Sequence, residues 1–412
     1  MNAPDPIVIT GLGPVTGVGI GADDFLDGWR EQRPGIRHIT RFDTSEYSVR
    51  IGGEIDLDPG PWLTEREVKK LDRSAVLGII AADLALESAG LHEGLPDAEG
   101  TGVFLGCGVG GGDAWLAGGV SVAAGRGHRI GPRIAPNGMA NTAAAQVSIR
   151  YGARGPSLSA GSACSSGSDA LISAIQSLRA GEVDIAIAGG CDAPINPIVL
   201  GSFCSLHALS TRNDDPATAC RPFDADRDGF VLAEGAAALV IETLSHAVSR
   251  GATPLAVLAG YGRSSDAHHI TQPTTDGAGA RRAIQRALHN AGLGPEDIDF
   301  VHAHGTGTAL NDSSESAAIG AIWPDGVPVV SMKGQLGHTL GASGPLAVIA
   351  AVQSLRTGDV PGTANFTRAD DDSRLRVLEP GIHRLPVSAA AVNTNAFGGE
   401  NTSLIITSTS HL

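Results

Sequence analysis

Short apolar runs alternate with longer amphipathic stretches along most of this 412-residue chain. The runs at 6–13, 102–108 and 184–190 contain branched or small apolar residues and end in glycine, which predicts buried strands. The stretches at 75–90 and 169–181 place apolar residues at helical spacing, which predicts helices. Strands that alternate with helices in this way favour an α/β fold with largely parallel, buried sheets.

Three stretches of the first part of the chain recur, in the same order, in the second part. The pairs are 7–13 with 255–262, 170–184 with 346–361, and 233–243 with 399–408. Chance similarity among small-residue strands and helices is the alternative, but three ordered pairs favour a duplicated unit. We therefore predict two α/β halves, residues 1–250 and residues 251–412.

Composition and charge narrow the class of protein. Hydrophobic residues make up 42% of the chain and charged residues 18%, which is typical of a folded globular protein. The formal net charge of −15 argues against a nucleic-acid-binding protein. The five cysteines show no CxxC pair, which indicates reduced thiols and a cytoplasmic location. Neither a signal peptide nor a run long enough for membrane insertion is predicted.

Cys164 lies among very small residues, in SACSSG, directly before a predicted helix. Backbone N–H groups at a helix N terminus favour a thiolate, lower the pKa of the thiol and can hold a developing oxyanion. A nucleophilic role for Cys164 is therefore one interpretation. A buried structural cysteine is the alternative, and the other four cysteines fit that role better.

Two later loops carry side chains that a nucleophilic thiol would need. His302 and His304 end a predicted strand in VHAHGTG, and strand alternation would point them the same way. Metal sites also use this spacing, but no third ligand follows at a familiar distance, so we predict no metal. Lys333 and His338 lie in SMKGQLGHTLG, and His338 falls near the position in the second half that Cys164 has in the first. A pseudo-twofold fold would bring His338 and Cys164 together.

A glycine-rich stretch near the N terminus offers a rival interpretation. GLGPVTG follows a predicted strand, as the phosphate-binding loop of an NAD-dependent dehydrogenase does. Its spacing is GxGxxxG rather than GxGxxG, and Asp23 and Asp24 come too early for a ribose contact. A turn at the end of the strand is the better interpretation.

A basic helix face is available on this acidic protein. LTEREVKKLDR carries four basic residues at helical spacing: Arg66, Lys69, Lys70 and Arg73. A solvated helix face and a docking site for an acidic partner explain this pattern equally well.

Six motifs together resemble the β-ketoacyl-acyl-carrier-protein synthases, the condensing enzymes of fatty-acid and polyketide synthesis. They follow that family's order and spacing along the whole chain: VITGLGPVTGVG, GPSLSAGSACSSGSDA, ALSTRNDDPATACRPFDADRDGFVLAEGAAALVIE, HAHGTGTALNDSSE, MKGQLGHTLGASG and NAFGGEN. The resemblance implies the thiolase fold, with two similar α/β halves stacked in α-β-α-β-α layers. It implies that the first half carries the nucleophile and the second half the two catalytic histidines.

The resemblance also implies the roles of individual residues. Cys164 would hold the acyl group, and His304 and His338 would stabilise the enolate formed when malonyl loses CO₂. The initiating enzymes have asparagine where this chain has His338, so the elongating type is implied. Three further residues match the family: Lys333 and Glu315 as a supporting ion pair, and Phe397 as the gating residue and the second oxyanion donor beside Cys164.

Partners and cofactors follow from the same resemblance. An acyl carrier protein would supply the phosphopantetheine arm and dock near Lys69 and Lys70, so no other cofactor is expected. The chain would form a dimer with a second copy or with a chain-length-factor-like homologue. A non-catalytic chain-length-factor subunit is an alternative, but that class would be expected to lack Cys164. A Cys-dependent acyltransferase without condensation is another, and both histidines and Lys333 argue against it.

The chain departs from the family's usual motifs at four positions. NAFGGEN has Asn395 and Glu400 where the family has phenylalanine and threonine, while Gly17 and Ala309 replace prolines. These changes remove no catalytic group, but two of them lie beside Phe397 and leave the acyl substrate open. The altered motif and the predominance of arginine over lysine favour a specialised polyketide or polyene pathway, with fatty-acid synthesis also open. Three apolar residues are candidates to line an acyl tunnel: Ile198, Phe203 and Leu340.

Overall fold

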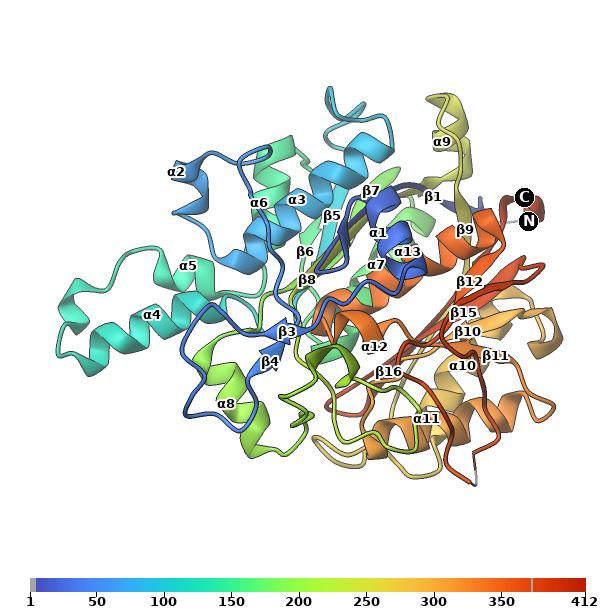
Figure 1. The fold of residues 1–412 in the computed structure, drawn as a ribbon. Helices are drawn as coiled ribbons and strands as arrows, with labels where there is room; N and C mark the ends of the chain where they lie inside the picture. Colours follow the sequence, from blue (N-terminus) through green and yellow to red (C-terminus); the bar gives the residue numbers. More distant parts are fainter. Residues whose placement is uncertain (1–4, 372) are drawn as a thin grey trace.

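One mixed sheet runs through the computed structural model, which describes residues 5–371 and 373–412 (Figure 1). Its strand order is β13-β11-β10-β15-β16-β9-β1-β8-β7-β5-β6, and β2 pairs with β1. Two small sheets, β12-β14 and β3-β4, lie beside it. The strands are β1 Ile7–Thr16, β2 Gly19–Ile20, β3 Arg37–His38, β4 Ile51–Gly52, β5 Thr101–Gly106, β6 Ser157–Leu158, β7 Ile185–Asp192, β8 Gly235–Thr243, β9 Ala256–Ser265, β10 Phe300–His302, β11 Pro328–Val330, β12 Asp359–Pro361, β13 Arg376–Val377, β14 Ile382–Arg384, β15 Ala389–Ala396 and β16 Glu400–Thr407.

The large sheet contains the same strand pattern twice. The order β6-β5-β7-β8-β1 in the first half corresponds to β11-β10-β15-β16-β9 in the second, with two parallel pairs followed by two antiparallel pairs in each. The halves join where β1 pairs antiparallel with β9, Val8 opposite Val257 and Ile9 opposite Ala256. The repeated sequence stretches fall on corresponding elements, so the predicted duplication is confirmed. The division near residue 250 stays a prediction, because both halves share one sheet.

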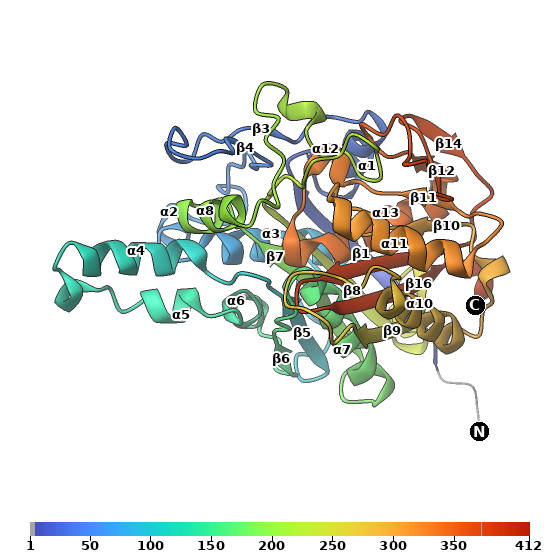
Figure 2. The same cartoon turned by 90° about the horizontal axis from the view of Figure 1, so that it is seen from below.

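Helices form three layers around the two halves of this sheet (Figures 1 and 2). The central layer contains α7 and α13, which pack on each other and on strands of both halves; α3 covers the outer face of the first half and α10 that of the second. The predicted α-β-α-β-α architecture is therefore present. The helices are α1 Ala22–Arg30, α2 Glu65–Val68, α3 Arg73–Ser88, α4 Gly112–Ala123, α5 Ile134–Gly138, α6 Thr142–Tyr151, α7 Ser166–Arg179, α8 Pro197–Ser205, α9 Leu244–Ser249, α10 Ala278–Ala291, α11 Ala309–Ile322, α12 Lys333–Leu336 and α13 Ser343–Thr357. Among the described residues, none of these helices has the length and apolar character needed to cross a bilayer.

Strand β1 continues through the glycines that were expected to end it. A Cβ at Gly11 would lie 2.1 Å from the carbonyl oxygen of Ala85, and a Cβ at Gly13 would lie 2.0 Å from that of Ala81. The glycines therefore let α3 pack directly on the backbone of β1. The interpretation of GLGPVTG as a strand-end turn is wrong. The dinucleotide-loop alternative fails for the same reason, because it needs a turn at this point.

An arm projects from the layered body of the molecule. It consists of α4, α5 and the loop between them, and it stands clear of the sheet in two perpendicular views (Figures 1 and 2). Several large apolar side chains on or next to the arm are exposed, among them Trp115 at 52%, Val122 at 58% and Met139 at 53%. Apolar exposure on this scale indicates a surface that another protein covers.

Gly167 lies where the two halves pack closely on each other, and we expect Gly167→Ala to destabilise the protein. A Cβ on Gly167 of α7 would lie 2.3 Å from the carbonyl oxygen of Gly341 and 2.6 Å from the ring of Pro345. Overpacking of this kind costs about 1–3 kcal/mol, which lowers the melting temperature by several degrees. Gly320→Ala in α11 is the matched control, because its Cβ meets open space. We expect that control to keep or slightly raise the melting temperature. Equal melting temperatures for the two variants would contradict the close packing.

Candidate active site

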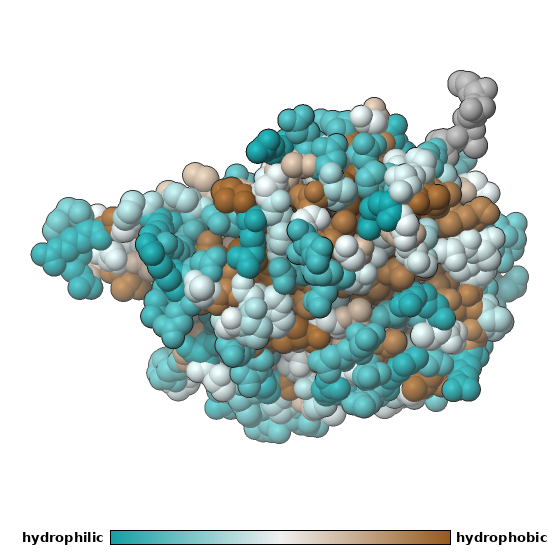
Figure 3. All heavy atoms as spheres, turned by 90° about the horizontal axis from the view of Figure 1, so that it is seen from above, coloured by the Kyte–Doolittle hydropathy of each residue, from teal (hydrophilic) through white to brown (hydrophobic). Residues whose placement is uncertain are grey.

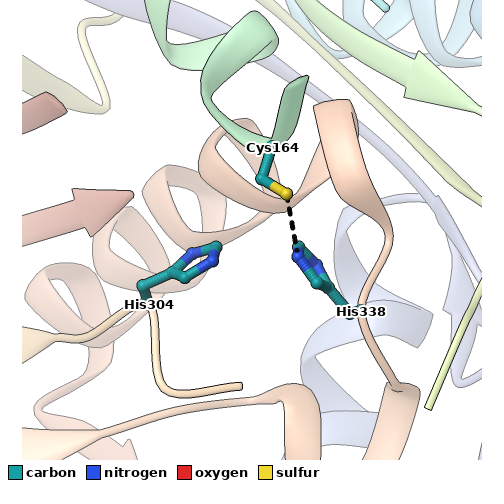
Figure 4. Close-up of side chains that lie close together, drawn as sticks. All are labelled: Cys164, His304 and His338. Carbon is teal, nitrogen blue, oxygen red and sulfur yellow. Dashed lines mark hydrogen bonds between the residues drawn. The ribbon is translucent and has the colours of Figure 1, made fainter. Parts of the chain in front are cut away.

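Cys164, His304 and His338 meet between the two halves of the fold (Figure 4). Cys164 Sγ lies 3.2 Å from His338 Nε2, and the two imidazole centroids lie 5.1 Å apart with their planes at 81°. Cys164 belongs to the single 3₁₀ turn Ala163–Ser165 before α7, His304 follows β10, and His338 follows α12. The structure therefore brings together the three residues that sequence analysis singled out.

The local backbone explains how Cys164 is presented. Ala163 has φ 47°, in the left-handed region, and this conformation turns the chain directly ahead of Cys164 and α7. Leu340 has the same φ of 47° in the turn Leu340–Ala342 before α13. The position in the second half that corresponds to Cys164 is thus Gly341, three residues beyond His338. The two side chains meet because the loop before this turn folds back, so the sequence match located His338 only approximately.

Hydrogen bonds determine which nitrogen of each imidazole faces the thiol. The backbone N–H of Leu340 donates to His338 Nδ1 at 3.3 Å, so Nδ1 carries the lone pair and Nε2 carries the proton. Lys333 Nζ, which can only donate, lies 3.5 Å from His304 Nδ1 and also donates to the carbonyl oxygen of His304. Both histidines therefore present an Nε2–H group. Burial and the charge of Lys333 hold the pKa of each well below the ordinary value, so both are neutral.

The same hydrogen bonds oppose a metal in this cluster. The three ligand atoms lie within 4.8 Å of one another, a spacing that could hold an ion. A metal would need the lone pair of each Nε2, and each imidazole proton would then move to Nδ1. There it would face the N–H of Leu340 or the ammonium group of Lys333. These hydrogen bonds therefore favour two imidazole N–H donors beside a thiol over a zinc site.

Lys333 and Glu315 support His304 from opposite sides of its backbone. Glu315 accepts the N–H groups of His304 and Gly305, both at 2.8 Å, while Lys333 donates to the carbonyl oxygen of His304. Burial raises the pKa of Glu315 and lowers that of Lys333, and each charge opposes the shift of the other. Among the described residues no direct salt bridge joins the two, so the expected ion pair acts here through the His304 backbone.

The thiol of Cys164 is less acidic than its position before a helix suggested. Burial raises the pKa of the thiol to about 12, although the charge of Lys333 and the backbone N–H groups of Phe397 and Cys164 act in the opposite direction. The expectation of a lowered thiol pKa is therefore wrong, because loss of hydration outweighs the helix terminus. The two N–H groups that approach Sγ belong to the residues expected to form an oxyanion hole.

A cavity of about 540 Å³ opens onto Cys164, His304 and His338. The apolar residues of its wall include Val109, Phe203, Leu206, Phe230, Leu340 and Phe397. The polar residues of its wall include Arg227, Gln272, Thr306, Thr308, Asn311, Asn395 and Asn401. The cavity therefore suits a ligand that carries both apolar and polar groups.

Aromatic rings connect the catalytic cluster to the expected gate. The ring of Phe230 lies 5.4 Å from that of His338, Phe203 lies 5.3 Å from Phe230, and Phe397 lies 6.2 Å from Phe203, measured between centroids. Of the three candidate tunnel residues, Phe203 and Leu340 line the cavity. Ile198 is not part of its lining and is 59% exposed on α8.

The four basic residues proposed for docking fall into two groups. Arg66 and Lys69 are exposed and Lys70 is half-buried, and the two lysines line a second cavity of about 690 Å³ between α3 and the arm. Arg73 instead binds the buried carboxylate of Glu234 and the carbonyl oxygen of Ile55. Arg133 of the arm lines the second cavity together with Lys69 and Lys70. Sequence analysis missed Arg133, because no pattern in the chain shows that the arm lies opposite α2.

Two other buried polar residues, His302 and Asp192, lie close to the elements that form the site. The ring of His302 lies 6.1 Å from that of Trp29, and burial lowers its pKa to about 3. His302 ends β10, so strand alternation does not extend to His304. Asp192, at the end of β7, accepts the N–H groups of Gly108, Val109 and Gly341 at 2.8–2.9 Å. It thereby ties the cavity wall to the turn behind His338, and an acidic residue directly after a fully apolar strand was its only sequence signal.

Comparison with known proteins agrees with this geometry. The family model described as "Beta-ketoacyl synthase, N-terminal domain" matches residues 4–247, and "Beta-ketoacyl synthase, C-terminal domain" matches residues 255–367. The chain is 38% identical over 403 residues to the 3-oxoacyl-[acyl-carrier-protein] synthase 2 of Synechocystis sp., covering 97% of each protein.

Solved structures show the same relationship. "The ishigamide ketosynthase/chain length factor" includes a chain that is 34% identical with a TM-score of 0.92, covering 98% of this chain and 100% of that one. A type II PKS acyl-carrier protein in complex with its ketosynthase bound to the hexaketide includes a chain that is 28% identical with a TM-score of 0.88, over 98% of this chain and 100% of that one.

Proposed function

The chain belongs to the β-ketoacyl synthase family, and we propose that it is an elongating β-ketoacyl-acyl-carrier-protein synthase. It transfers an acyl group to Cys164 and condenses that group with malonyl on a carrier protein. One observation carries the assignment of the catalytic residues. Cys164 Sγ lies beside two neutral Nε2–H donors, those of His304 and His338, and two backbone N–H groups approach the same sulfur.

Acyl transfer begins with the thiol of Cys164. Its sulfur attacks the thioester carbonyl, and the N–H groups of Cys164 and Phe397 hold the resulting oxyanion. The bond between the acyl carbon and the sulfur of the carrier arm breaks, and the proton released by Cys164 leaves on that sulfur. The raised thiol pKa keeps Cys164 protonated until a substrate arrives.

Condensation uses the two histidines. Malonyl loses CO₂, and the enolate oxygen that forms accepts hydrogen bonds from Nε2–H of His304 and His338. The enolate carbon attacks the acyl carbon on Cys164, a carbon–carbon bond forms, and the carbon–sulfur bond to Cys164 breaks. The thiolate then takes one proton from water, so each cycle consumes one proton. Lys333 and Glu315 hold His304 in its donor orientation throughout.

The phosphopantetheine arm fits the cavity without a further cofactor. The relative whose complex is described above binds an acyl-carrier protein. In this chain the polar residues of the cavity wall suit the phosphopantetheine arm, and the apolar residues, with Phe203 and Leu340, suit the acyl chain. We propose that the carrier protein docks on the exposed Arg66 and on Lys69 and Lys70, which share the second cavity with Arg133 of the projecting arm, α4–α5.

Reversing charge at this docking surface should weaken carrier binding. We expect Lys69→Glu/Lys70→Glu to raise the KM for carrier-bound substrate about tenfold, because an acidic carrier would meet like charge. The effect should shrink with added salt and vanish with a pantetheine thioester that lacks the carrier protein. Arg384→Glu is the control, since Arg384 is 89% exposed on β14, away from the arm. An equal rise of KM in both variants, or in the carrier-free assay, would contradict docking at this surface.

The arm and the adjacent sheet edge fit a dimer interface. Figure 3 shows the arm standing out from the body, with hydrophilic residues at its tip. The exposed apolar side chains lie along the arm and continue to Ile149, at 73%, and to Leu158 in β6, at 53%. Strand β6 is also an edge of the large sheet. We propose that a second copy of this chain, or a chain-length-factor-like homologue, covers this surface.

Two aspects of the proposal concern the cellular context. The five cysteines are free, which supports a reducing, cytoplasmic location. The altered motif at Asn395 and Glu400 supports a specialised polyketide or polyene pathway, with fatty-acid synthesis as the second candidate. A chain-length-factor subunit without catalysis is disfavoured, because the nucleophile and both histidine donors are in place.

Intact-protein mass spectrometry tests the proposed function directly. The protein is mixed with a panel of acyl-carrier proteins that carry different chain lengths, and malonyl-carrier protein is then added. We expect an acyl adduct that disappears on addition of malonyl-carrier protein, together with a β-ketoacyl product on the carrier. An adduct that malonyl-carrier protein never consumes would indicate an acyltransferase that does not catalyse condensation. No adduct with any donor, both alone and with a co-purified partner subunit, would overturn the proposal.

A further inference from the structure

Asn395 gives the wall of the cavity a feature that the proposed mechanism does not use. It lies at the end of β15, two residues before Phe397, and lines the same cavity as Cys164 and His304. Its side-chain oxygen Oδ1 is buried and has no hydrogen-bond donor among the residues that the structure describes. A buried acceptor without a partner is unfavourable, so its occurrence in a substrate cavity requires an explanation.

A chain of hydrogen bonds fixes the direction in which the Asn395 amide points. Asp312 accepts the N–H groups of Thr306, Gly307 and Phe223, so its carboxylate acts as an acceptor. Asn311 Nδ2 donates to Asp312 at 3.0 Å, which turns Asn311 Oδ1 the other way. Asn395 Nδ2 lies 3.4 Å from that oxygen and donates to it.

The result of this chain is a carbonyl acceptor at Asn395. Because Asn311 donates to Asp312 and Asn395 donates to Asn311, the free group at the end of the series is Asn395 Oδ1 rather than Nδ2. The carboxylate of Asp312 thereby fixes Asn395 Oδ1 as an acceptor, which favours a ligand with a hydrogen-bond donor. Asp312 accepts every hydrogen bond that it makes in this series, and a carboxylate has no proton to donate to Asn395 Oδ1.

We propose that Asn395 is a specificity-determining residue whose Oδ1 accepts a hydrogen bond from an N–H or O–H donor on the thioester substrate. The inference rests on the proposed function and adds a chemical requirement to it: the substrate carries a donor within a few bonds of the thioester. The donor is either an amide N–H of the pantetheine arm or a hydroxyl group of the acyl chain. Asn311 acts as a positioning residue, because it orients the Asn395 amide.

Matched substrates separate these two sources. One pair is a pantetheine thioester and its analogue in which ester oxygen replaces the amide N–H nearest the sulfur. The other pair is a hydroxyacyl thioester and the acyl thioester of the same length without the hydroxyl. For one of the two pairs we expect the wild type to load Cys164 with a kcat/KM about five- to tenfold lower for the member without the donor, as expected for one hydrogen bond. The pair that shows the loss identifies the donor.

Variants assign that discrimination to Asn395. Asn395→Leu has a similar shape without the acceptor, and we expect it to treat both members of each pair alike. Asn311→Ala should weaken the preference, and Asn311→Ala/Asn395→Leu should show no further loss, because the two residues act in series. Melting temperatures near the wild-type value show that a variant is folded.

The inference is overturned if Asn395→Leu retains the wild-type preference, or if the wild type shows no preference in either pair. Failure of this inference alone can be told apart from failure of the proposed function. If only this inference fails, the wild type still loads acyl groups on Cys164 and only the discrimination is absent. If the proposed function fails, the wild type loads none of the four thioesters, and both the function and this inference are overturned.

Discussion

Cys164→Ala should abolish acyl loading and lower the condensation rate by at least ~10⁴-fold, because Cys164 is the only cysteine among the residues that line the cavity. We expect decarboxylation of malonyl-carrier protein to remain, since the Nε2–H groups of His304 and His338 do not depend on the sulfur for their orientation. Leu340 N–H and Lys333 fix them instead. The measurement is intact-protein mass for loading and CO₂ release for decarboxylation, on the same preparation.

The control for this prediction is another cysteine. Cys204 is, like Cys164, a free cysteine, but it belongs to α8 and does not line the cavity. We expect Cys204→Ala to load and condense at rates close to those of the wild type. Condensation that survives in Cys164→Ala would show that a different nucleophile carries the acyl group. Loss of CO₂ release together with loading would show that the histidine donors need the thiol.

The fold was predictable because its signals are local and repeated. Buried strands and helices followed from apolar runs and spacing, and the helices predicted at 75–90 and 169–181 occur at Arg73–Ser88 and Ser166–Arg179. The duplication followed from similarity between corresponding elements of the two halves. The glycines of β1 misled, because close packing on α3 and a turn require the same residue type.

The sequence motifs predicted which residues form the site, but not the contacts or the pKa shifts of those residues. The resemblance singled out Cys164, His304 and His338, and the structure places them together. It did not show that Glu315 and Lys333 act through the backbone of His304, nor that burial raises the thiol pKa. Both depend on which groups the folded chain removes from water, and sequence spacing carries no information on that.

Residues that connect distant segments were the least visible. Asp192 binds backbone N–H groups more than 80 positions before it and 149 positions after it. Arg133 reaches the basic helix only because the arm folds beside it. Asn395 was recognised as a departure from the family's motif, but its orientation follows from Asn311 and Asp312, which no sequence pattern links to it.

His304→Ala separates the two half-reactions in the direction opposite to Cys164→Ala. Decarboxylation and condensation should fall ~10²–10³-fold, as is typical when one oxyanion donor is removed. Acyl loading should stay within about threefold of the wild type. In the proposed mechanism loading uses the backbone N–H groups of Cys164 and Phe397, and the thiol is hydrogen-bonded to His338 rather than to His304. Loading therefore also reports that the variant is folded.

A conservative variant tests whether His304 acts through its N–H group. His304→Asn keeps a side-chain N–H donor, so we expect it to recover part of the CO₂ release that His304→Ala loses, without changing loading. If both variants lose loading as strongly as decarboxylation, His304 serves the architecture of the whole site rather than the enolate. If neither loses decarboxylation, His338 alone holds the enolate. The opposite behaviour of the Cys164 and His304 variants is what a divided mechanism requires, since the sulfur forms the acyl-enzyme and the imidazoles stabilise the carbanion.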